Sequence, residues 1–382
     1  MIKLGKKKSF VYSVMEADLR KQIREDVLKS GEKLLSESEF SSRYGISRRS
    51  VRQALANLTN ERLIYSHAGS GCFVAENIPG KQPEHLRIVL ILPEVDNAFM
   101  NELNHGVQIM AEESGCDLIY QSSGQSHEKE RLHILHWLEE EKIDGMILFP
   151  MVGNHNTDLI FELKKRNMPF VLVDRFFQDI DTDYVSVDNY KGAYEAVLHL
   201  GQHSCKNIAH LKGSPSSANV ARYEGYRDAL AALGLVYDPA LVISMEAGYE
   251  TEENVGSDVV FGREAMKKLL KSGKEIDAVF ACNDNMAIGG MQSIRKMGLC
   301  VPQDISVVGF DDLKVASMLE VPLTTVRQPK EQIGMETIRL LLQRIQEKAQ
   351  GTPVKEYQHI VLKTELIQRS SVQNKSMMEV NV

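Results

Sequence analysis

Arginine side chains gather in one short stretch of the sequence, residues 47–55, and their spacing is that of a helix. Val51, Leu55 and Leu58 recur at the interval that forms one apolar helix face. The opposite face carries three polar side chains: Arg49, Arg52 and Gln53. Guanidinium groups pair bidentately with guanine or clamp phosphates, so this face could read a DNA major groove. Taken alone, the pattern is also that of a solvated charged helix surface.

Polar and aromatic side chains that could bind a hydroxylated ligand follow several apolar runs later in the sequence. They are Asp96-Asn97-Ala98-Phe99, Asp174-Arg175-Phe176, Asn283-Asp284 and Asp311-Asp312. Carboxylates accept bidentate hydrogen bonds from neighbouring hydroxyl groups, and aromatic rings pack on the C–H face of a sugar. Each Asp or Asn after a strand could instead cap the next helix, and Asp284 in particular has the position of a cap or turn residue.

The other reactive side chains form no catalytic or metal-binding motif. His199 and His203 stand four residues apart near Cys205, but no acidic residue or second thiolate stands at helpful ligand spacing. The sequence has no Walker-type phosphate loop and no G-x-S-x-G nucleophile motif. We therefore predict no metal, no cofactor and no catalytic residue, and we expect a protein that is not an enzyme.

Charge is distributed unevenly along the 382 residues, a length that suits two or three domains. Residues 1–83 carry 15 Lys and Arg against 9 Asp and Glu, whereas the whole chain carries 45 against 52. A basic first segment on an acidic remainder indicates that only this segment meets a polyanion. The five cysteines are scattered, and we find neither a signal segment nor a membrane span, so we expect reduced thiols in a cytoplasmic protein.

The elements that would position the arginine stretch are predicted by helix spacing and by capping residues. Apolar spacing predicts a first amphipathic helix over residues 12–28. Ser36 and Glu39 form a capping box that opens a second, short helix, and Gly45 suits the left-handed position at its end. Ser47 is then placed to cap the arginine helix, so a tight turn separates two short helices.

A glycine-rich hairpin completes this segment, because apolar residues 63–65 and 72–74 flank it. In this order the elements resemble the GntR-type winged helix-turn-helix. The motifs that carry the resemblance are Gly31-Glu32-Lys33-Leu34-Leu35-Ser36-Glu37, Tyr44-Gly45-Ile46-Ser47-Arg48-Arg49-Ser50-Val51-Arg52-Gln53-Ala54-Leu55 and Gly69-Ser70-Gly71-Cys72-Phe73-Val74. The sequence departs from that family at Leu35, where proline is usual, and at Cys72, where threonine is usual.

The resemblance implies DNA contacts from the arginine helix and from the wing. Carried over by position, they fall on Ser47, Arg48, Arg52 and Gly69. The helical pattern adds Arg49 to this group. The complete set of candidate DNA-binding residues is Ser36, Ser47, Arg48, Arg49, Ser50, Arg52, His67 and Gly69.

From residue 86 onward, short apolar runs alternate with amphipathic helices. The apolar runs are residues 88–92, 118–120, 146–149, 170–173, 208–211, 278–281 and 305–308. Helical patterns fall near residues 99–114, 127–142, 157–167, 190–201, 221–233, 260–272, 284–297 and 331–349. Continuous apolar strands between helices predict parallel sheets covered on both faces. Ligands of such sheets bind beyond the carboxyl ends of the strands.

Residues 86–371 resemble the effector domain of the LacI/GalR repressors, which is itself similar to periplasmic sugar-binding proteins. The motifs are Val187-Asp188-Asn189-Tyr190-Lys191-Gly192-Ala193, Ala221-Arg222-Tyr223-Glu224-Gly225-Tyr226, Ala281-Cys282-Asn283-Asp284, the run from Val301 to Asp312, and Leu323-Thr324-Thr325-Val326-Arg327-Gln328-Pro329. One departure is Gly201-Gln202-His203, where the family usually has glycine followed directly by histidine.

That resemblance implies two lobes between which the chain crosses three times, with an effector in the cleft. The candidate effector contacts are Phe99, Asp174, Arg222, Asn283, Asp311 and Gln328, with Tyr249 as a weaker candidate for a stacking ring.

Together the two resemblances predict a ligand-responsive transcription regulator, and a repressor in particular. We expect a small α+β winged helix-turn-helix domain over residues 1–75, a linker over 76–85, a two-lobed α/β periplasmic-binding-protein-like domain over 86–371, and a polar tail over 372–382. The expected partners are double-stranded operator DNA, a small-molecule effector of the sugar class, and a second copy in a homodimer. A transport-type sugar-binding protein and a sugar-metabolising enzyme are the alternatives, against which the basic winged helix and the missing catalytic motifs argue.

Overall fold

The computed structural model describes residues 9–24, 27–67, 70–75, 85–94, 97–139, 143–153, 155–246, 257–354 and 356–373. The chain divides into two compact units, Met1–His85 and Leu86–Val382. Each unit has hydrophobic clusters of its own, as separate domains do. Within the described ranges, no helix is both long and apolar enough to cross a membrane.

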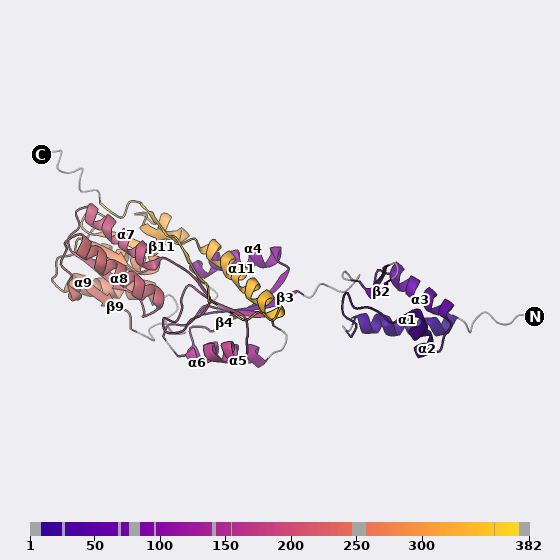
Figure 1. Ribbon diagram of the computed structural model, residues 1–382. Coiled ribbons are helices and arrows are strands. Elements are labelled where there is room, and N and C mark those ends of the chain that lie inside the picture. The colour runs from indigo at the N-terminus through magenta and orange to yellow at the C-terminus, as the bar shows by residue number, and fades with distance from the viewer. Residues whose placement is uncertain are drawn as a thin grey trace, which may run out of the picture. The chain divides into compact units, whose positions relative to one another are not determined.

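The described residues of the first unit form three helices followed by a two-stranded hairpin (Figure 1). The elements are α1 Ser9–Arg24, α2 Glu37–Tyr44, α3 Arg48–Asn60, β1 Ile64–His67 and β2 Gly71–Val74, with the strands antiparallel. The three helices share one core, formed by Met15, Leu19, Ile23, Phe40, Val51, Ala54, Leu55 and Leu58. The predicted order of three helices and a hairpin is confirmed, although α1 lies closer to the N-terminus than the predicted 12–28.

Side-chain caps set the limits of α2 and α3. Glu39 N donates to Ser36 Oγ at 3.4 Å, and Ser36 N donates to Glu39 Oε2 at 2.7 Å, so the predicted capping box is present. Gly45 ends α2 with a left-handed φ of 64°. Ser50 N donates to Ser47 Oγ at 3.2 Å, which confirms Ser47 as the cap of α3. These caps satisfy free backbone groups and fix where the arginine helix begins.

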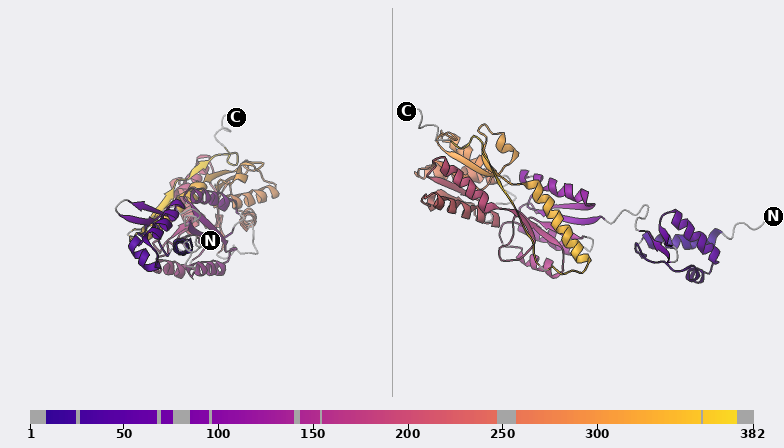
Figure 2. Two further views of the ribbon diagram at one scale, coloured as in Figure 1. Left: turned by 90° about the vertical axis from the view of Figure 1, so that its right-hand side faces the viewer. Right: turned by 45° about the horizontal axis from the view of Figure 1, so that its top comes forward.

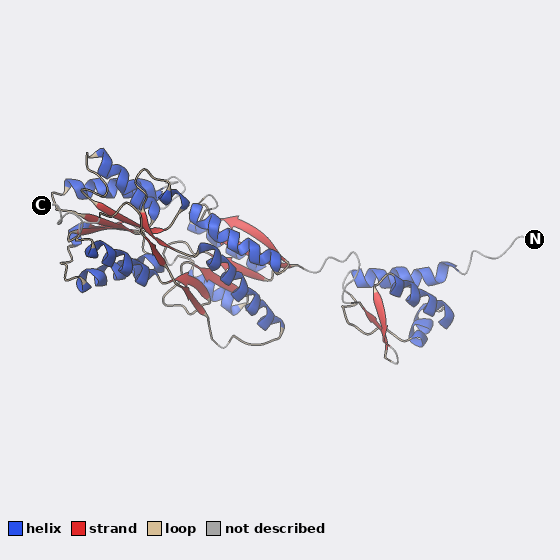
Figure 3. Cartoon of the chain, turned by 90° about the horizontal axis from the view of Figure 1, so that it is seen from above, coloured by secondary structure: helices blue, strands red, loops and turns tan. Residues whose placement is uncertain are grey.

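The second unit consists of two lobes, each built on a six-stranded sheet between helices (Figure 3). Lobe 1 contains β3 Leu86–Leu92, β4 Cys116–Ser122, β5 Gly145–Leu148, β6 Phe170–Val173, β7 Tyr184–Val187 and β13 His359–Leu362, all parallel, in the order β13-β7-β6-β5-β3-β4. Its helices are α4 Ala98–Glu113, α5 His127–Glu139, α6 Thr157–Lys165 and α11 Lys330–Ala349. Alternate residues of β3 pack on α4 and α11 or on α5 and α6.

Lobe 2 repeats this layering around a second sheet. Its strands are β8 Ile208–Lys212, β9 Val242–Ser244, β10 Ala278–Ala281, β11 Ser306–Asp311, β12 Thr324–Arg327 and β14 Glu365–Ile367, in the order β14-β12-β11-β10-β8-β9. Only β14 runs antiparallel among these strands. Helices α7 Asn189–Gln202 and α8 Ser217–Ala232 cover one face, and α9 Ser257–Lys271 and α10 Asp284–Lys296 cover the other.

The chain passes three times between the lobes, as the family resemblance implied. The passages follow β7, β12 and β13, because α7 packs in lobe 2, α11 packs in lobe 1 and β14 pairs with β12. After the second passage α11 returns to lie along α4 (Figure 2). The strands β7, β9, β12, β13 and β14 were absent from the predicted runs because polar residues interrupt the apolar pattern of β7 and β12, and because β9, β13 and β14 are partly exposed.

Candidate functional site

The polar face of α3 carries the predicted arginines at the surface of the first unit. Val51, Ala54, Leu55 and Leu58 are buried, whereas Ser47, Arg48, Arg49 and Arg52 are exposed and Ser50 is half-buried. The separation of an apolar stripe from a basic face is therefore real, and it leaves the guanidinium groups accessible to a polyanion.

Two of these arginines also contact α2. Arg48 Nη2 donates to Ser38 Oγ at 2.9 Å, and Arg52 Nε pairs with Glu37 Oε2 at 2.8 Å. The Arg52 side chain is nevertheless 68% exposed. An exposed ion pair of this kind contributes only about 0–1 kcal/mol, so a phosphate or a guanine can displace the carboxylate.

The remaining DNA-contact candidates lie at the start of α2 and in the wing. Ser36 is exposed but is occupied by the capping box. His67 is exposed at the end of β1, next to the hairpin turn. Gly69 lies outside the described residues. Tyr65 stacks on Phe73 across the hairpin with ring centroids 5.6 Å apart, which stiffens the wing.

Six of the seven predicted effector contacts line one cleft in the second unit. Phe99 and Asp174 come from lobe 1; Arg222, Asn283 and Asp311 come from lobe 2; Gln328 lies on the second passage between them. The free space between these side chains is about 90 Å³ in this arrangement of the lobes. Tyr249 lies outside the described residues. The strand-end pattern thus identified side chains that the fold brings together.

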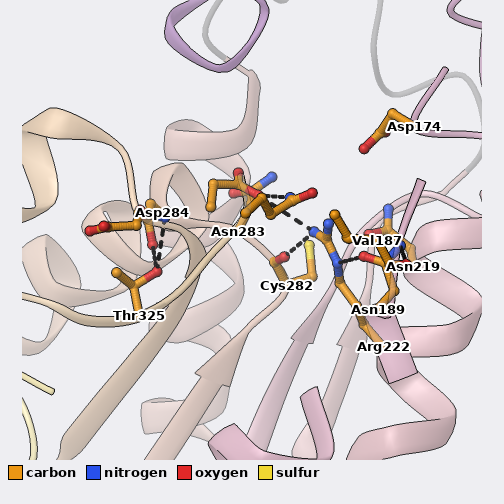
Figure 4. A network of polar contacts seen from close by, with 12 residues as sticks. Asp174, Val187, Asn189, Asn219, Arg222, Cys282, Asn283, Asp284 and Thr325 are labelled. Carbon is orange, nitrogen blue, oxygen red and sulfur yellow. Dashed lines mark hydrogen bonds and ion pairs between the residues drawn. The ribbon is translucent and has the colours of Figure 1, made fainter. Parts of the chain in front are cut away.

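Arg222 brings a positive charge to the cleft, and Figure 4 shows the hydrogen bonds that hold its guanidinium group. Its guanidinium donates from Nε to Asn189 Oδ1 at 2.8 Å and from Nη1 to the Cys282 carbonyl at 2.6 Å. It also lies 3.8 Å from the centroid of the Phe310 ring. These contacts hold a 5% exposed cation in one orientation, with Asp311 Oδ1 3.9 Å from Nη1.

Two buried carboxyl groups face the cleft from opposite lobes. Burial raises the pKa of Asp311 to about 6, although the nearby Arg222 charge and a hydrogen bond from Gln328 act in the other direction. Burial also raises the pKa of Asp174, which lies 3.7 Å from Arg175 Nε. Burial makes both groups costly to keep ionised, and a hydrogen-bond donor from a ligand would relieve that cost.

Asn283 both lines the cleft and caps α10, whereas Asp284 does neither. Asn283 is the cap of α10, accepting from Met286 N at 2.8 Å, and it also donates to Asp258 Oδ2 at 2.8 Å. Asp284 is fully buried, bonded to Thr325 Oγ1 and to Leu313 N, and burial raises its pKa. The expectation that Asp284 serves as a cap or turn residue is wrong, because its side chain joins three segments of lobe 2.

The sequence prediction missed several side chains of the cleft. They are Asn97, Phe149, Arg175, Asn219, Asp258 and Asn285. Arg175 directly follows Asp174, and Asn97 caps α4 just before Phe99. Both therefore stand among the polar residues that follow apolar strands, where a ligand was expected to bind. Asn219 and Asp258 stand in the first turns of α8 and α9, where no local pattern separates a cleft residue from a solvated one.

Acceptors, donors and rings therefore surround one small volume. Asp174 and Asp311 offer carboxylate oxygens, Arg222 offers N–H groups, and Phe99 and Phe149 offer apolar surface. The Oε1 atom of Gln328 is buried and has no hydrogen-bond partner within the described residues. This mixture suits a compact molecule with several hydroxyl groups.

Comparison with known proteins agrees with both halves of this description. Residues 11–74 match the sequence profile of bacterial regulatory proteins of the gntR family, and residues 197–372 match that of the periplasmic binding protein-like domain. The arabinose metabolism transcriptional repressor of Geobacillus stearothermophilus is 27% identical over 364 residues, which cover 94% of this chain and 97% of the relative.

Two further relatives cover three quarters or more of the chain. The HTH-type transcriptional repressor PurR of Histophilus somni strain 129Pt is 31% identical over 286 residues, covering 75% of this chain and 81% of the relative. The solved structure of the transcriptional regulator CelR–cellobiose complex has a TM-score of 0.65 and 28% identity, covering 85% of this chain and 90% of that one.

These relatives are DNA-binding transcription regulators, so neither a transport protein nor an enzyme describes the chain. The arginine helix belongs to the part that matches the gntR profile, and Arg222, Asn283 and Asp311 belong to the part that matches the effector-domain profile. The chain therefore belongs to the effector-controlled transcriptional repressors, and within them it joins a gntR-type DNA-binding domain to a LacI-type, periplasmic binding protein-like domain.

Proposed function

We propose that this repressor binds its operator as a cytoplasmic homodimer through residues 1–75, and that a neutral sugar in the cleft of residues 86–371 changes operator affinity. Residues 76–85 join the two parts. The observation that supports this most strongly is that six side chains from both lobes and the passage between them line a single cleft. A ligand that touches both lobes can favour one lobe arrangement over another, and only such a difference shifts a conformational equilibrium.

The charges of the cleft support a neutral ligand. Three carboxyl groups, from Asp174, Asp258 and Asp311, stand against the guanidinium groups of Arg175 and Arg222. Such a balance offers no surplus positive charge for a phosphate, whereas hydroxyl groups can donate to the carboxylates. Because one relative is a repressor of arabinose metabolism and one solved relative holds cellobiose, L-arabinose and cellobiose are the first ligands to test.

The reading of DNA is proposed for the exposed face of α3 and for the wing. Ser47, Arg48, Arg49 and Arg52 would contact bases and phosphates in the major groove, and His67 would approach the backbone from the hairpin. Their exposure and the basic balance of residues 1–83 support this assignment.

The pairing of two chains is proposed for lobe 2. An apolar groove there is lined by Ile288, Met291, Leu299, Val301, Leu319 and Val321. Met318 beside it is 67% exposed. Exposed apolar surface of this kind marks an interaction site. A two-fold dimer would present two DNA-binding domains to a near-palindromic operator.

The test combines ligand screening with operator binding. Thermal shift of the full-length protein would be measured with L-arabinose, D-xylose, D-ribose, cellobiose and glucose 6-phosphate. An operator fragment would be selected from a random DNA library, and its affinity measured with and without each ligand that raises the melting temperature. We expect a neutral sugar to raise that temperature and to change operator affinity. A response to the sugar phosphate alone, or a bound sugar without effect on DNA, would refute the proposal.

A further inference from the structure

Lys330 is a buried lysine at an unusual position, the first residue of α11. Its side chain is only 3% exposed. A positive charge is disfavoured at a helix N-terminus, because the free N–H groups there already carry positive partial charge. The charge is nevertheless kept out of water, so its partners must compensate for that cost.

The Lys330 ammonium has three oxygen partners, two through hydrogen bonds and one through an ion pair. Nζ donates to the carbonyl of Asp311 at 2.6 Å and to the carbonyl of Asp312 at 3.2 Å, and it pairs with Glu102 Oε2 at 3.2 Å. The two carbonyls belong to lobe 2, whereas Glu102 lies on α4 in lobe 1. One side chain therefore bonds both lobes beside the second passage of the chain.

The lobe 2 end of this contact is a strained turn that carries a cleft carboxylate. Asp311 has a φ of 115° and Asp312 a φ of 51°, values that favour glycine. Lys330 holds the carbonyls of both residues, and the Asp311 side chain faces Arg222 and Gln328 in the cleft. Lys330 therefore holds the backbone from which that carboxylate projects.

The lobe 1 end of the contact is rigid. A Cβ at Gly106 of α4 would lie 1.9 Å from the Glu331 carbonyl, and one at Gly334 of α11 would lie 2.2 Å from the Leu103 carbonyl. The backbones of α4 and α11 are therefore in direct contact, and the two helices cannot slide freely. Glu102 stands one turn after Phe99, which lines the same cleft.

From these contacts we infer that Lys330 is a positioning residue that ties the Asp311 turn of lobe 2 to the α4–α11 pair of lobe 1. Through this contact, the effect of a bound effector is transmitted from the cleft to lobe 1. This inference rests on the proposed function, because it names the link through which an effector acts. Glu102 is the lobe 1 anchor of the link. Loss of either group should reduce the effect of a bound sugar on operator affinity, even when the sugar is saturating.

The test uses full-length Lys330→Met, Glu102→Gln, the double variant and Lys348→Met. The last is a matched control, because Lys348 is an exposed lysine on the same helix. The measured quantity is the ratio of operator affinities without and with saturating sugar, using the neutral sugar found by thermal shift, with L-arabinose tried first. Saturation removes the effect of a merely weakened site. We expect Lys330→Met and Glu102→Gln each to bring this ratio at least threefold closer to one than it is in the wild type. The double variant should have the same ratio as Lys330→Met, and the control should have the wild-type ratio. Wild-type ratios in both single variants would overturn the inference.

A second measurement needs no ligand and separates this inference from the proposed function. Asp312 N donates to Thr325 Oγ1 at 3.3 Å and Leu313 N donates to Asp284 Oδ2 at 2.7 Å, so hydrogen exchange at these amides reports on the turn. Lys330→Met should accelerate both amides at least tenfold, and Lys348→Met should not. If no sugar binds, the proposed function fails while exchange still decides the inference, and unchanged exchange in Lys330→Met would refute it.

Discussion

Replacing Asp311 with asparagine should make the repressor insensitive to its effector while leaving operator binding intact. The change keeps the size of the side chain, and asparagine tolerates a positive φ better than most residues. It removes the charge of a carboxylate that accepts from Gln328 Nε2 at 2.7 Å and lies 3.9 Å from Arg222 Nη1. The backbone that Lys330 holds is unchanged, so the lobes should keep their arrangement.

The size of the effect follows from the acceptor that is lost. A hydrogen bond to a charged acceptor contributes ~1.5–3 kcal/mol net. That loss corresponds to roughly a 10- to 150-fold weaker effector affinity. Operator affinity without effector should equal that of the wild type, because α3 belongs to the other compact unit and has its own core.

Fluorescence anisotropy of a labelled operator, titrated with the identified sugar, measures both quantities in one experiment. Wild type, Asp311→Asn and the exposed-surface control Asp179→Asn would be compared. We expect the release midpoint to move by the factor above in Asp311→Asn only. Release of the operator at the wild-type sugar concentration would remove Asp311 from the site, and lost operator binding in the absence of sugar would make the residue a structural one.

Four further predictions concern the reading helix, the buried carboxyl group and the dimer. Arg52→Ala should weaken operator binding by ~1–3 kcal/mol and relax sequence preference if the guanidinium reads a base, as gel shifts on operator variants would report. Effector affinity measured by calorimetry should fall as the pH drops below about 6, because protonation of Asp311 removes a charged acceptor. The Asp311 carboxyl group binds a proton more tightly in the folded state than in the unfolded state, where its pKa is near 3.8. Its contribution to the free energy of unfolding therefore decreases as the pH rises from 3.8 to about 6. Asp311→Asn should therefore raise the urea midpoint near pH 7 more than near pH 4. A fragment of residues 84–382 should sediment as a dimer and residues 1–80 as a monomer, and a monomeric larger fragment would contradict the proposed lobe 2 interface.

Local sequence signals predicted most of the framework because they report on neighbouring residues. The capping box of Ser36 and Glu39 is complete within four residues, and Gly45 needs only its own φ to end α2. The buried strands were visible as apolar runs because both faces of each sheet are covered. Asp174 and Asp311 were found for a related reason. Each stands at the end of an apolar strand, and ligands of parallel sheets bind beyond the carboxyl ends of the strands.

What the sequence did not reveal depends on contacts between distant segments. Asp284 was misassigned because its bonds to Leu313 and Thr325 join three separate segments, and nothing beside it in the sequence records them. Lys330 attracted no attention because a lysine at a helix start is ordinarily exposed. Its role depends on Glu102 of α4, which comes near only because α11 returns to lobe 1, and on two carbonyl groups of lobe 2.

The passages between the lobes explain how so small a site could act on the whole second unit. Asn189, which accepts from Arg222 at 2.8 Å, follows the first passage, and Gln328 lies on the second. A ligand bonded to Arg222 and Gln328 would therefore act on the segments that connect the lobes, and its contact with Asp174 would make its binding depend on the lobe arrangement. A tenfold change in operator affinity requires a difference of only ~1.4 kcal/mol between the two arrangements. That is about the net contribution of one hydrogen bond, so a single sugar hydroxyl that reaches Asp174 in one arrangement and not in the other is sufficient.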